Sequence, residues 1–252
     1  MFTKNSKRAE SPRPTEPRRG RGRPRGATKQ GVAARKQLFK AAIKLIASRG
    51  YEETTLRDIA RKADVSVGLL YRYFPSKRAV VLALYDELSA EYAASASKMG
   101  PGPWRERFLF ALKASLGVLA RQREILAALT PVLVGDPDQG LFAPATAFSR
   151  QRVQTVFQEA VLGASDAPGP EVAGALGRLL YVAHLTVILW WLLDKSPRQR
   201  STKELVAVLE RTLPAAAFAL RFERSRAWVR AADALCREGL FGEELPGRVG
   251  RP

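Results

Sequence analysis

Apolar residues recur every three or four positions along most of the chain, which is the spacing of amphipathic helices. The first such segment places Leu38, Ala42, Leu45 and Ile46 on one face and lysines on another. No segment alternates with the period of two that is typical of strands. An all-α fold of about nine or ten helices is therefore expected. The expected ranges are 32–49, 54–63, 67–74, 77–97, 104–121, 123–134, 142–163, 170–194, 201–222 and 223–239.

Glycine and proline mark where these helices end or bend. Gly50 provides a C-terminal stop for the first helix, and Pro75 ends the third. Pro131 and Pro214 fall inside helical patterns. They should kink or split those helices, because proline lacks the backbone N–H and clashes with the preceding turn.

Composition and periodicity together divide the chain into four parts. Residues 1–30 are rich in Arg, Pro, Gly and Ser. They are expected to be a disordered basic arm, because they can bury too little apolar surface to offset the ordering entropy. Residues 31–78 form a three-helix unit, which the helix over 77–97 links to a larger helical bundle over 79–240. Residues 241–252 are expected to be a disordered tail.

Two short helices joined by the turn at 64–66 have the spacing of a helix-turn-helix unit. In such a unit the second helix enters the major groove of DNA. A shared core is expected from Leu56, Ile59, Ala60, Leu70 and Phe74. The outward candidates for reading bases are Ser66, Val67, Gly68, Tyr71 and Arg72.

Two of the outward residues leave alternatives open. Gly68 is a poor helix former, by ~1 kcal/mol relative to alanine. It therefore marks either a close approach of a partner to the backbone or a tight crossing of two helices. Arg72 can make the bidentate contact with guanine that is the commonest specific pairing. The alternative for Arg72 is a phosphate contact or exposure to solvent.

Residues 35–90 resemble the TetR family of bacterial transcriptional regulators. The matching residues are Ala42, Gly50 and Tyr51, followed by "TTLRDIARKADVS" (54–66) and "VGLLYRYFPSK" (67–77). The resemblance implies a dimeric regulator with an N-terminal DNA-binding domain and a C-terminal helical domain for effector binding and dimerisation.

The same resemblance assigns roles to individual residues. It implies that Thr55, Tyr71, Tyr73 and Lys77 contact phosphates and that residues 66–72 reach base edges. Asp64 departs from the family, which often has glycine in this turn. Aspartate tolerates a left-handed backbone better than most residues, so the turn is expected to persist.

The charge of the chain is concentrated at its beginning. The whole sequence has a net charge of +18, with 42 Lys and Arg against 24 Asp and Glu. Residues 1–78 hold 21 of the basic and 6 of the acidic residues, a net charge of +15. Such a field indicates a polyanionic partner, either nucleic acid or an acidic membrane surface.

Within the basic arm, the run "RGRPR" resembles an AT-hook, a short segment that enters the minor groove of A·T-rich DNA. Arg21, Arg23 and Arg25 are the expected groove contacts. Glycine lets the backbone lie deep, and arginine favours the negative potential of a narrow groove. The alternative is non-specific attraction to phosphates, or solubility alone.

The C-terminal two-thirds contain no recognisable catalytic pattern. His184 is the only histidine and Cys236 the only cysteine, and neither lies in a known motif. HExxH, CxxC, P-loop and GxGxxG patterns are absent from the sequence. We therefore expect no enzyme, no cofactor and no metal site. Cys236 is interpreted as a small residue on a helix, with a redox sensor as the alternative.

Aromatic residues on successive C-terminal helices are candidates for an apolar effector pocket. The candidates are Trp104, Phe108, Phe148, Tyr181 and His184. Polar groups that could close such a pocket are His184, Thr186 and Arg178. The alternative for each aromatic residue is a core or dimer contact. For His184 it is a core or interface histidine whose hydrogen bonds are satisfied.

The longest apolar run, 179–193, is shorter than the ~20 residues that a membrane span needs. We interpret it as a buried helix. Because this run is apolar nearly all round, a partner chain is expected to cover it. By the family resemblance, the helices over 170–194 and 201–222 would form a four-helix dimer interface.

The function predicted from these features is a ligand-responsive repressor that binds a palindromic operator as a homodimer. Its effector is expected to be small and apolar or amphipathic. The N-terminus has no apolar segment typical of a secretory signal, and a bacterial cytoplasmic, nucleoid-associated location is expected. Four alternatives remain: a regulator that answers to a protein or to nothing, an architectural DNA-binding protein without operator choice, an enzyme with an appended DNA-binding domain, and a membrane-surface protein.

Overall fold

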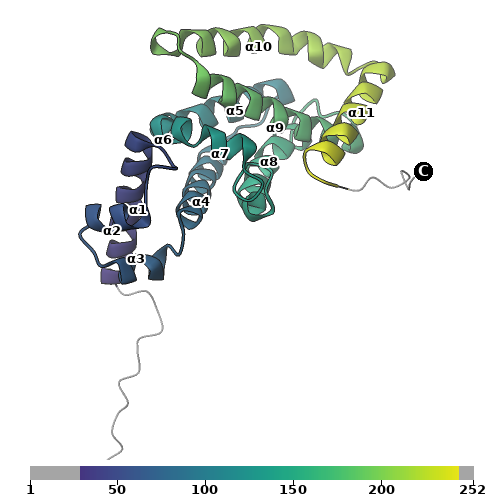
Figure 1. Cartoon of the computed structure of the whole chain (residues 1–252). Coiled ribbons are helices and arrows are strands. Elements are labelled where there is room, and N and C mark those ends of the chain that lie inside the picture. Colours follow the sequence, from purple (N-terminus) through teal and green to yellow (C-terminus); the bar gives the residue numbers. More distant parts are fainter. Residues whose placement is uncertain (1–28, 244–252) are drawn as a thin grey trace, which may run out of the picture.

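The computed structural model of the chain describes residues 29–243, and every regular element in that range is a helix (Figure 1). The all-α expectation is confirmed. Eleven α-helices and two short 3₁₀ helices occur within these residues. The α-helices are α1 (Lys29–Arg49), α2 (Leu56–Lys62), α3 (Val67–Tyr73), α4 (Lys77–Ala96), α5 (Trp104–Ala120), α6 (Arg123–Ala128), α7 (Thr130–Gly135), α8 (Ala147–Leu162), α9 (Pro170–Leu193), α10 (Arg200–Ala219) and α11 (Glu223–Gly239). The 3₁₀ helices are η1 (Pro144–Thr146) and η2 (Pro197–Gln199).

The two internal prolines behave differently. Pro131 lies in the first turn of α7, and the single helix expected over 123–134 is split into α6 and α7 at this point. Pro214 lies inside α10, which continues without a break from Arg200 to Ala219.

Hydroxyl side chains fix the start of each helix around the helix-turn-helix unit. Thr55 begins α2 in a reciprocal capping box with Asp58, and Ser66 and Ser76 cap α3 and α4. Such caps satisfy backbone N–H groups that have no partner inside the helix. Thr54 does not cap α2; it is buried, and its hydroxyl donates to the Gly50 carbonyl at 2.8 Å.

The buried apolar residues form two clusters. The smaller joins α1, α2, α3 and the first turn of α4, and the larger fills the C-terminal bundle. Helix α4 contributes to both, with Val80 in the smaller cluster and Val81 and Leu84 in the larger. Helix α1 does the same through Leu45 and Ile46. The helix-turn-helix unit and the bundle therefore share two continuous helices.

The helix-turn-helix unit and α10 lie at opposite ends of the molecule. Helices α1, α2 and α3 gather at one end and α10 lies across the opposite end, with α4 between them (Figure 1). The core expected for the helix-turn-helix unit is confirmed: Ile59, Ala60, Leu70 and Phe74 are buried, and Leu56 packs against them.

Helix α9 is the most apolar element of the bundle. By length and composition it could cross a membrane, although half of its apolar window is buried inside the fold. The helix runs from Pro170 to Leu193, as the expected range of 170–194 predicts, and its apolar window is longer than the 15-residue run over 179–193. Since α9 packs closely against α8 and α11, we describe it as a core helix.

Candidate DNA interface and candidate effector cavity

Helix α3 presents one solvent-exposed face, which we call the α3 face. Leu70 is buried on the opposite side, against α1 and α2. The exposed fraction is 51% for Tyr71 and 38% for Val67, which are high values for large side chains without a partner. The α3 face consists of Ser66, Val67, Gly68, Tyr71 and Arg72, all exposed.

Gly68 is not required by the packing of the fold. A methyl group added at Gly68 would meet no atom within 4 Å, so no helix crosses there. This finding removes one of the two explanations drawn from the sequence. The explanation that remains is close approach of a partner from outside.

The turn before α3 has the conformation that the sequence requires. Asp64 has a φ of +50°, in the left-handed region that glycine often fills. The turn is also held from α1, because the side-chain amide of Gln37 donates to the Ala63 carbonyl at 2.7 Å. The orientation of α3 is therefore fixed by α1 as well as by α2.

The three candidate phosphate contacts outside the α3 face already have partners. Thr55 is exposed, and its hydroxyl donates to Asp58 at 2.6 Å. Tyr73 is half-buried, with the Arg72 guanidinium 6.0 Å from its ring centroid. Lys77 Nζ donates to the carbonyls of Tyr51 and Glu52 at 2.7 and 3.1 Å. Contact with DNA by these groups remains a prediction.

The arginines of the basic arm, Arg21, Arg23 and Arg25, lie outside the described residues. So do most of the expected arm and most of the expected tail. The proposed minor-groove contact therefore remains a sequence-based prediction.

A cavity of about 360 Å³ lies between α4, α5, α7, α8 and α9. This volume is within the range of small-molecule sites, ~300–1,000 Å³. Of the five residues expected to line a pocket, Tyr181 and His184 do so. Thr186 also lies on the wall. The rest of the lining is mostly aliphatic, from residues such as Leu88, Leu126, Leu133, Leu141, Leu185 and Ile188.

The other three pocket candidates lie outside this lining. Trp104 is buried at the start of α5, where its backbone N–H donates to Asp166 at 2.7 Å. Phe108 is buried in the core with its ring centroid 6.0 Å from that of Phe157. Phe148 is 44% exposed on α8.

Arg178, considered as a polar group of the pocket, makes a different contact. Its guanidinium donates two 2.6 Å hydrogen bonds to the carboxylate of Asp233. This bidentate pair raises the pKa of Arg178 and ties α9 to α11. The arginine is therefore a link between helices and does not line the cavity.

His184 and three tyrosines of the cavity are buried and uncharged. His184 Nε2 lies 2.8 Å from Ser115 Oγ, and complete burial lowers the pKa of the imidazole to about 3. Burial also raises the pKa values of Tyr85, Tyr92 and Tyr181, so these phenols keep their protons.

Several polar cavity residues were not singled out from the sequence, namely Tyr85, Ser89, Tyr92, Ser115, Thr130, Thr146, Ser149 and Arg150. The seven-residue spacing of Tyr85 and Tyr92 places them on one face of α4. That spacing was the signal available, and it is equally typical of a packed core.

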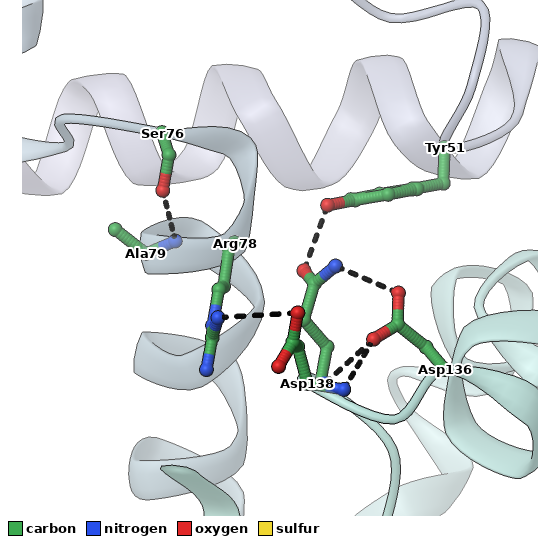
Figure 2. Close-up of polar contacts among 7 residues, drawn as sticks. Tyr51, Ser76, Arg78, Ala79, Asp136 and Asp138 are labelled. Carbon is green, nitrogen blue, oxygen red and sulfur yellow. Dashed lines mark hydrogen bonds and ion pairs between the residues drawn. The ribbon is translucent and has the colours of Figure 1, made fainter. Parts of the chain in front are cut away.

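A polar contact links the helix-turn-helix unit to the loop beneath the cavity (Figure 2). Tyr51, just after α1, donates to Gln139 Oε1 at 2.8 Å. Asp136 holds Gln139 by accepting its backbone and side-chain N–H groups at 2.8 and 3.0 Å. In the first turn of α4, Arg78 pairs with Asp138 at 3.9 Å.

The same loop forms part of the cavity wall. Leu133 and Leu141, on either side of residues 136–140, both line the cavity. Their backbones are joined by a 2.9 Å hydrogen bond from Leu141 N to Leu133 O. A methyl group at Gly140 would lie 2.5 Å from the Asp136 carbonyl, so only glycine fits this tight loop. A displacement of Leu133 and Leu141 would therefore be transmitted through this loop to Tyr51.

Comparison with known proteins gives a family match for the first three helices and the start of α4. Residues 38–84, from α1 into α4, match the model for "Bacterial regulatory proteins, tetR family". This part of the chain is similar to the TetR family. This agrees with the resemblance carried by residues 35–90; the AT-hook-like extension has no such support.

Curated relatives are similar over part of their length. The HTH-type transcriptional repressor KstR of Rhodococcus jostii is 35% identical over 103 residues, which cover 41% of this chain and 42% of KstR. The HTH-type transcriptional regulator HbdR of an Aromatoleum species is 34% identical over 92 residues, 36% of this chain and 40% of HbdR. The chain thus spans less than half the length of these relatives, which are regulators by name.

Solved structures extend the likeness to the whole fold. A TetR transcriptional regulator from Nitrosomonas europaea has a TM-score of 0.53 at 23% identity, covering 74% of this chain and 99% of that one. FadR from Bacillus subtilis, solved in complex with stearoyl-CoA, has a TM-score of 0.55 at 16% identity and covers 69% and 96%. At these identities the comparison establishes the fold alone, for the part of the chain that each structure covers.

Proposed function

We propose that the chain is a DNA-binding transcriptional repressor whose affinity for a palindromic operator falls when a small molecule occupies the cavity. The observation that carries the proposal is the α3 face, an exposed surface at the end of a family-matched helix-turn-helix unit. The net charge of +15 over residues 1–78 supports DNA as the partner. The relatives named as repressors favour repression over activation.

Within this proposal the α3 face reads bases in the major groove. Arg72 is the candidate for a bidentate contact with guanine. Thr55, Tyr73 and Lys77 surround the face and would contact phosphates, which position the protein without reading sequence. The Ser66 hydroxyl accepts from Leu69 as a helix cap, so its contact with DNA would be a donated hydrogen bond. The Thr55 hydroxyl would have to release Asp58 before donating to a phosphate.

Dimerisation is supported by the surface of α9 and α10. Only Thr202 and Leu213 are buried among the residues of α10. Trp190 and Leu193 of α9 are 50% and 60% exposed, and Val208 of α10 is 43% exposed. An apolar surface of this kind is unfavourable in water and typical of an interface between subunits. A homodimer would pair these helices and give the two-fold symmetry that a palindrome requires.

The cavity and the loop over 136–140 suggest how a ligand would act. Helix α4 lines the cavity with Tyr85 and Tyr92 and begins at Lys77, beside α3. A molecule that displaces α4 or the wall at Leu133 would alter the spacing of the two α3 faces in the dimer. DNA and ligand would then be coupled by ~1–3 kcal/mol, in both directions.

The first test is selection of DNA from a random library by the full-length chain, followed by footprinting. An inverted repeat protected on both half-sites is the expected result. Arg72→Ala should weaken binding about 5- to 150-fold and relax the preference at one position. Arg224→Ala, an exposed arginine of α11 far from α3 and outside the proposed interface (Figure 1), is the matched control. Uniform coating without a protected repeat would favour the architectural alternative.

The second test is the oligomeric state. Trp190→Asp should convert a dimer to a monomer, measured by sedimentation, because a charge would be buried in the interface. Trp228→Ser on α11, which removes a 77% exposed tryptophan outside the proposed interface, is the control. A wild-type monomer in solution and on DNA would contradict the dimer. A cytoplasmic, nucleoid-associated location belongs to the same proposal.

A further inference from the structure

Four buried polar atoms of the cavity residues have no hydrogen-bonding partner within residues 29–243. They are Tyr85 Oη, Tyr92 Oη, Ser149 Oγ and His184 Nδ1. In the same range Arg123 Nε is also unpartnered, although the Nη2 atom of that guanidinium donates to three carbonyls. Native interiors contain few such atoms, because each is unfavourable without a partner. Their concentration around one cavity indicates that its occupant supplies hydrogen bonds.

The unpartnered atoms are spread along the cavity. Tyr85 and Tyr92 are two turns apart on α4, so their Cα atoms are separated by about 10 Å. The Tyr92 and His184 rings lie nearly parallel, with centroids 6.2 Å apart. Tyr92 is a donor, and His184 Nδ1 accepts or donates according to which partner of the Ser115–His184 bond carries the proton. A molecule in the cavity would therefore meet polar atoms of the protein at separate places along a mostly apolar wall.

The charges around the cavity restrict the occupant further. No aspartate or glutamate lines it, so a cationic ligand would lack a counter-charge. The single charged residue on the wall is Arg150. Its Nη1 atom already donates to the carbonyls of Leu141 and Ala143 at 3.1 and 3.2 Å. His184 and the tyrosines are uncharged at neutral pH, so Arg150 is the one group on the wall that could pair with a charged ligand, an anion, and its Nη1 atom is directed to these two carbonyls instead.

We propose that the effector is an uncharged, mostly apolar molecule carrying a carbonyl or hydroxyl oxygen that accepts a hydrogen bond from Tyr92. A hydroxyl can also satisfy His184 Nδ1, whichever tautomer is present. The inference rests on the proposed function only in calling the occupant an effector. The chemistry of the occupant follows from the cavity itself.

The test uses the full-length chain and four ten-carbon probes: 1-decanol, 2-decanone, decanoate and decylammonium. Binding is measured by isothermal titration calorimetry at pH 7. The two neutral probes should bind, and decylammonium should bind at least about tenfold more weakly. Decanoate tests whether Arg150 attracts an anion, and we expect decanoate to bind more weakly than 2-decanone.

Variants identify the polar contact. Tyr92→Phe should lower the affinity for 2-decanone about tenfold, the effect of one lost hydrogen bond at a buried site. The same variant should unfold at an unchanged or higher temperature without ligand, because it removes an unpartnered buried hydroxyl. Thr155→Val removes an exposed hydroxyl of α8 that bonds to the Gln151 carbonyl, outside the cavity. It is the matched control and should bind all probes as the parent chain does.

Several results would overturn the inference. They are decylammonium or decanoate binding more tightly than the neutral probes, no binding of either neutral probe, and unchanged 2-decanone affinity in Tyr92→Phe. DNA binding by the same preparations is measured separately. A chain that binds its operator but takes only charged probes keeps the proposed function and loses the inference. A chain that binds decanol with no change in operator affinity keeps the ligand chemistry and loses the effector role.

Discussion

Tyr51 and Gln139, 88 positions apart in the chain, are joined by a 2.8 Å hydrogen bond from the phenol to the side-chain carbonyl. Three elements meet at Tyr51. Tyr51 itself follows the end of α1, and Gln139 belongs to the loop beside the cavity. From the start of α4, Lys77 Nζ lies 4.5 Å from the centroid of the Tyr51 ring. Burial raises the pKa of the phenol, so it remains a donor at neutral pH.

Removing the Tyr51 hydroxyl should weaken the response to ligand more than the binding of DNA itself. Tyr51→Phe keeps the ring against Lys77 and loses one hydrogen bond, worth about 0.5–1.5 kcal/mol. The ratio of operator affinities without and with a bound probe should therefore fall about two- to tenfold. Fluorescence anisotropy with labelled operator, at fixed decanol concentration, measures this ratio.

A double-mutant cycle with Gln139→Ala sharpens this prediction. If the two side chains act through their mutual bond, the double variant should respond to ligand much as either single variant does. Additive effects would mean that Tyr51 acts through Lys77 or the ring alone. Thr155→Val again serves as the variant that should leave the ratio unchanged.

Gly68→Ala separates folding from DNA recognition. The added methyl group has no atom within 4 Å, and alanine is the better helix former by about 1 kcal/mol. The variant should therefore unfold at an equal or higher temperature. If DNA approaches the backbone closely at this point, operator affinity should fall about tenfold or more.

Gly117→Ala is the control for this substitution. Gly117 is exposed in α5, and its added methyl group likewise meets nothing within 4 Å. It should gain stability without any change in DNA affinity. Operator affinity that stays at the parental value in Gly68→Ala would show that DNA does not approach α3 closely there.

The buried imidazole of His184 should make stability fall in mildly acidic solution. Its pKa is lowered to about 3 in the folded chain, whereas an imidazole in an unfolded chain titrates at about 6.5. Below pH 6.5 the unfolded state therefore binds a proton that the folded state does not, and the free energy of unfolding decreases until about pH 3. At pH 5.5 the loss is about 1 kcal/mol.

Urea unfolding at pH 7.5 and 5.5 measures this effect. Because the chain has one histidine, His184→Gln should remove most of the difference between the two values. A parental difference that survives in His184→Gln would have to come from carboxylates, and the assignment to His184 would then be wrong.

The all-helical fold and the helix-turn-helix unit could be predicted from sequence, because residues close together in the chain determine them. The capping hydroxyls of Thr55, Ser66 and Ser76 fix where helices begin, and the apolar period fixes the core of Ile59, Leu70 and Phe74. Asp64 in the turn also has the left-handed backbone that its chemistry tolerates. None of these features depends on distant parts of the chain.

The cavity and the hydrogen-bonded link from its loop to the helix-turn-helix unit could not be predicted in the same way. An aromatic residue on an amphipathic helix has the same pattern whether it fills a core, as Phe108 does, or lines a cavity, as Tyr92 does. Arg178 and Asp233, or Tyr51 and Gln139, become partners only through packing of distant helices. The periodicity of a single sequence contains no information about such pairs.

Deleting residues 1–28 tests the basic arm without entering α1, which begins at Lys29. The deletion should weaken binding most on operators with A·T-rich flanks, because a narrow minor groove attracts arginine. Replacing Arg21, Arg23 and Arg25 together by lysine keeps the charge and should still abolish the flank preference, since arginine is the less strongly hydrated cation. Salt titration of operator affinity, on matched A·T-rich and G·C-rich flanks, measures both effects. An equal loss of operator affinity on both kinds of flank, with a shallower salt dependence, would mean that the arm is attracted to phosphates and does not read the minor groove.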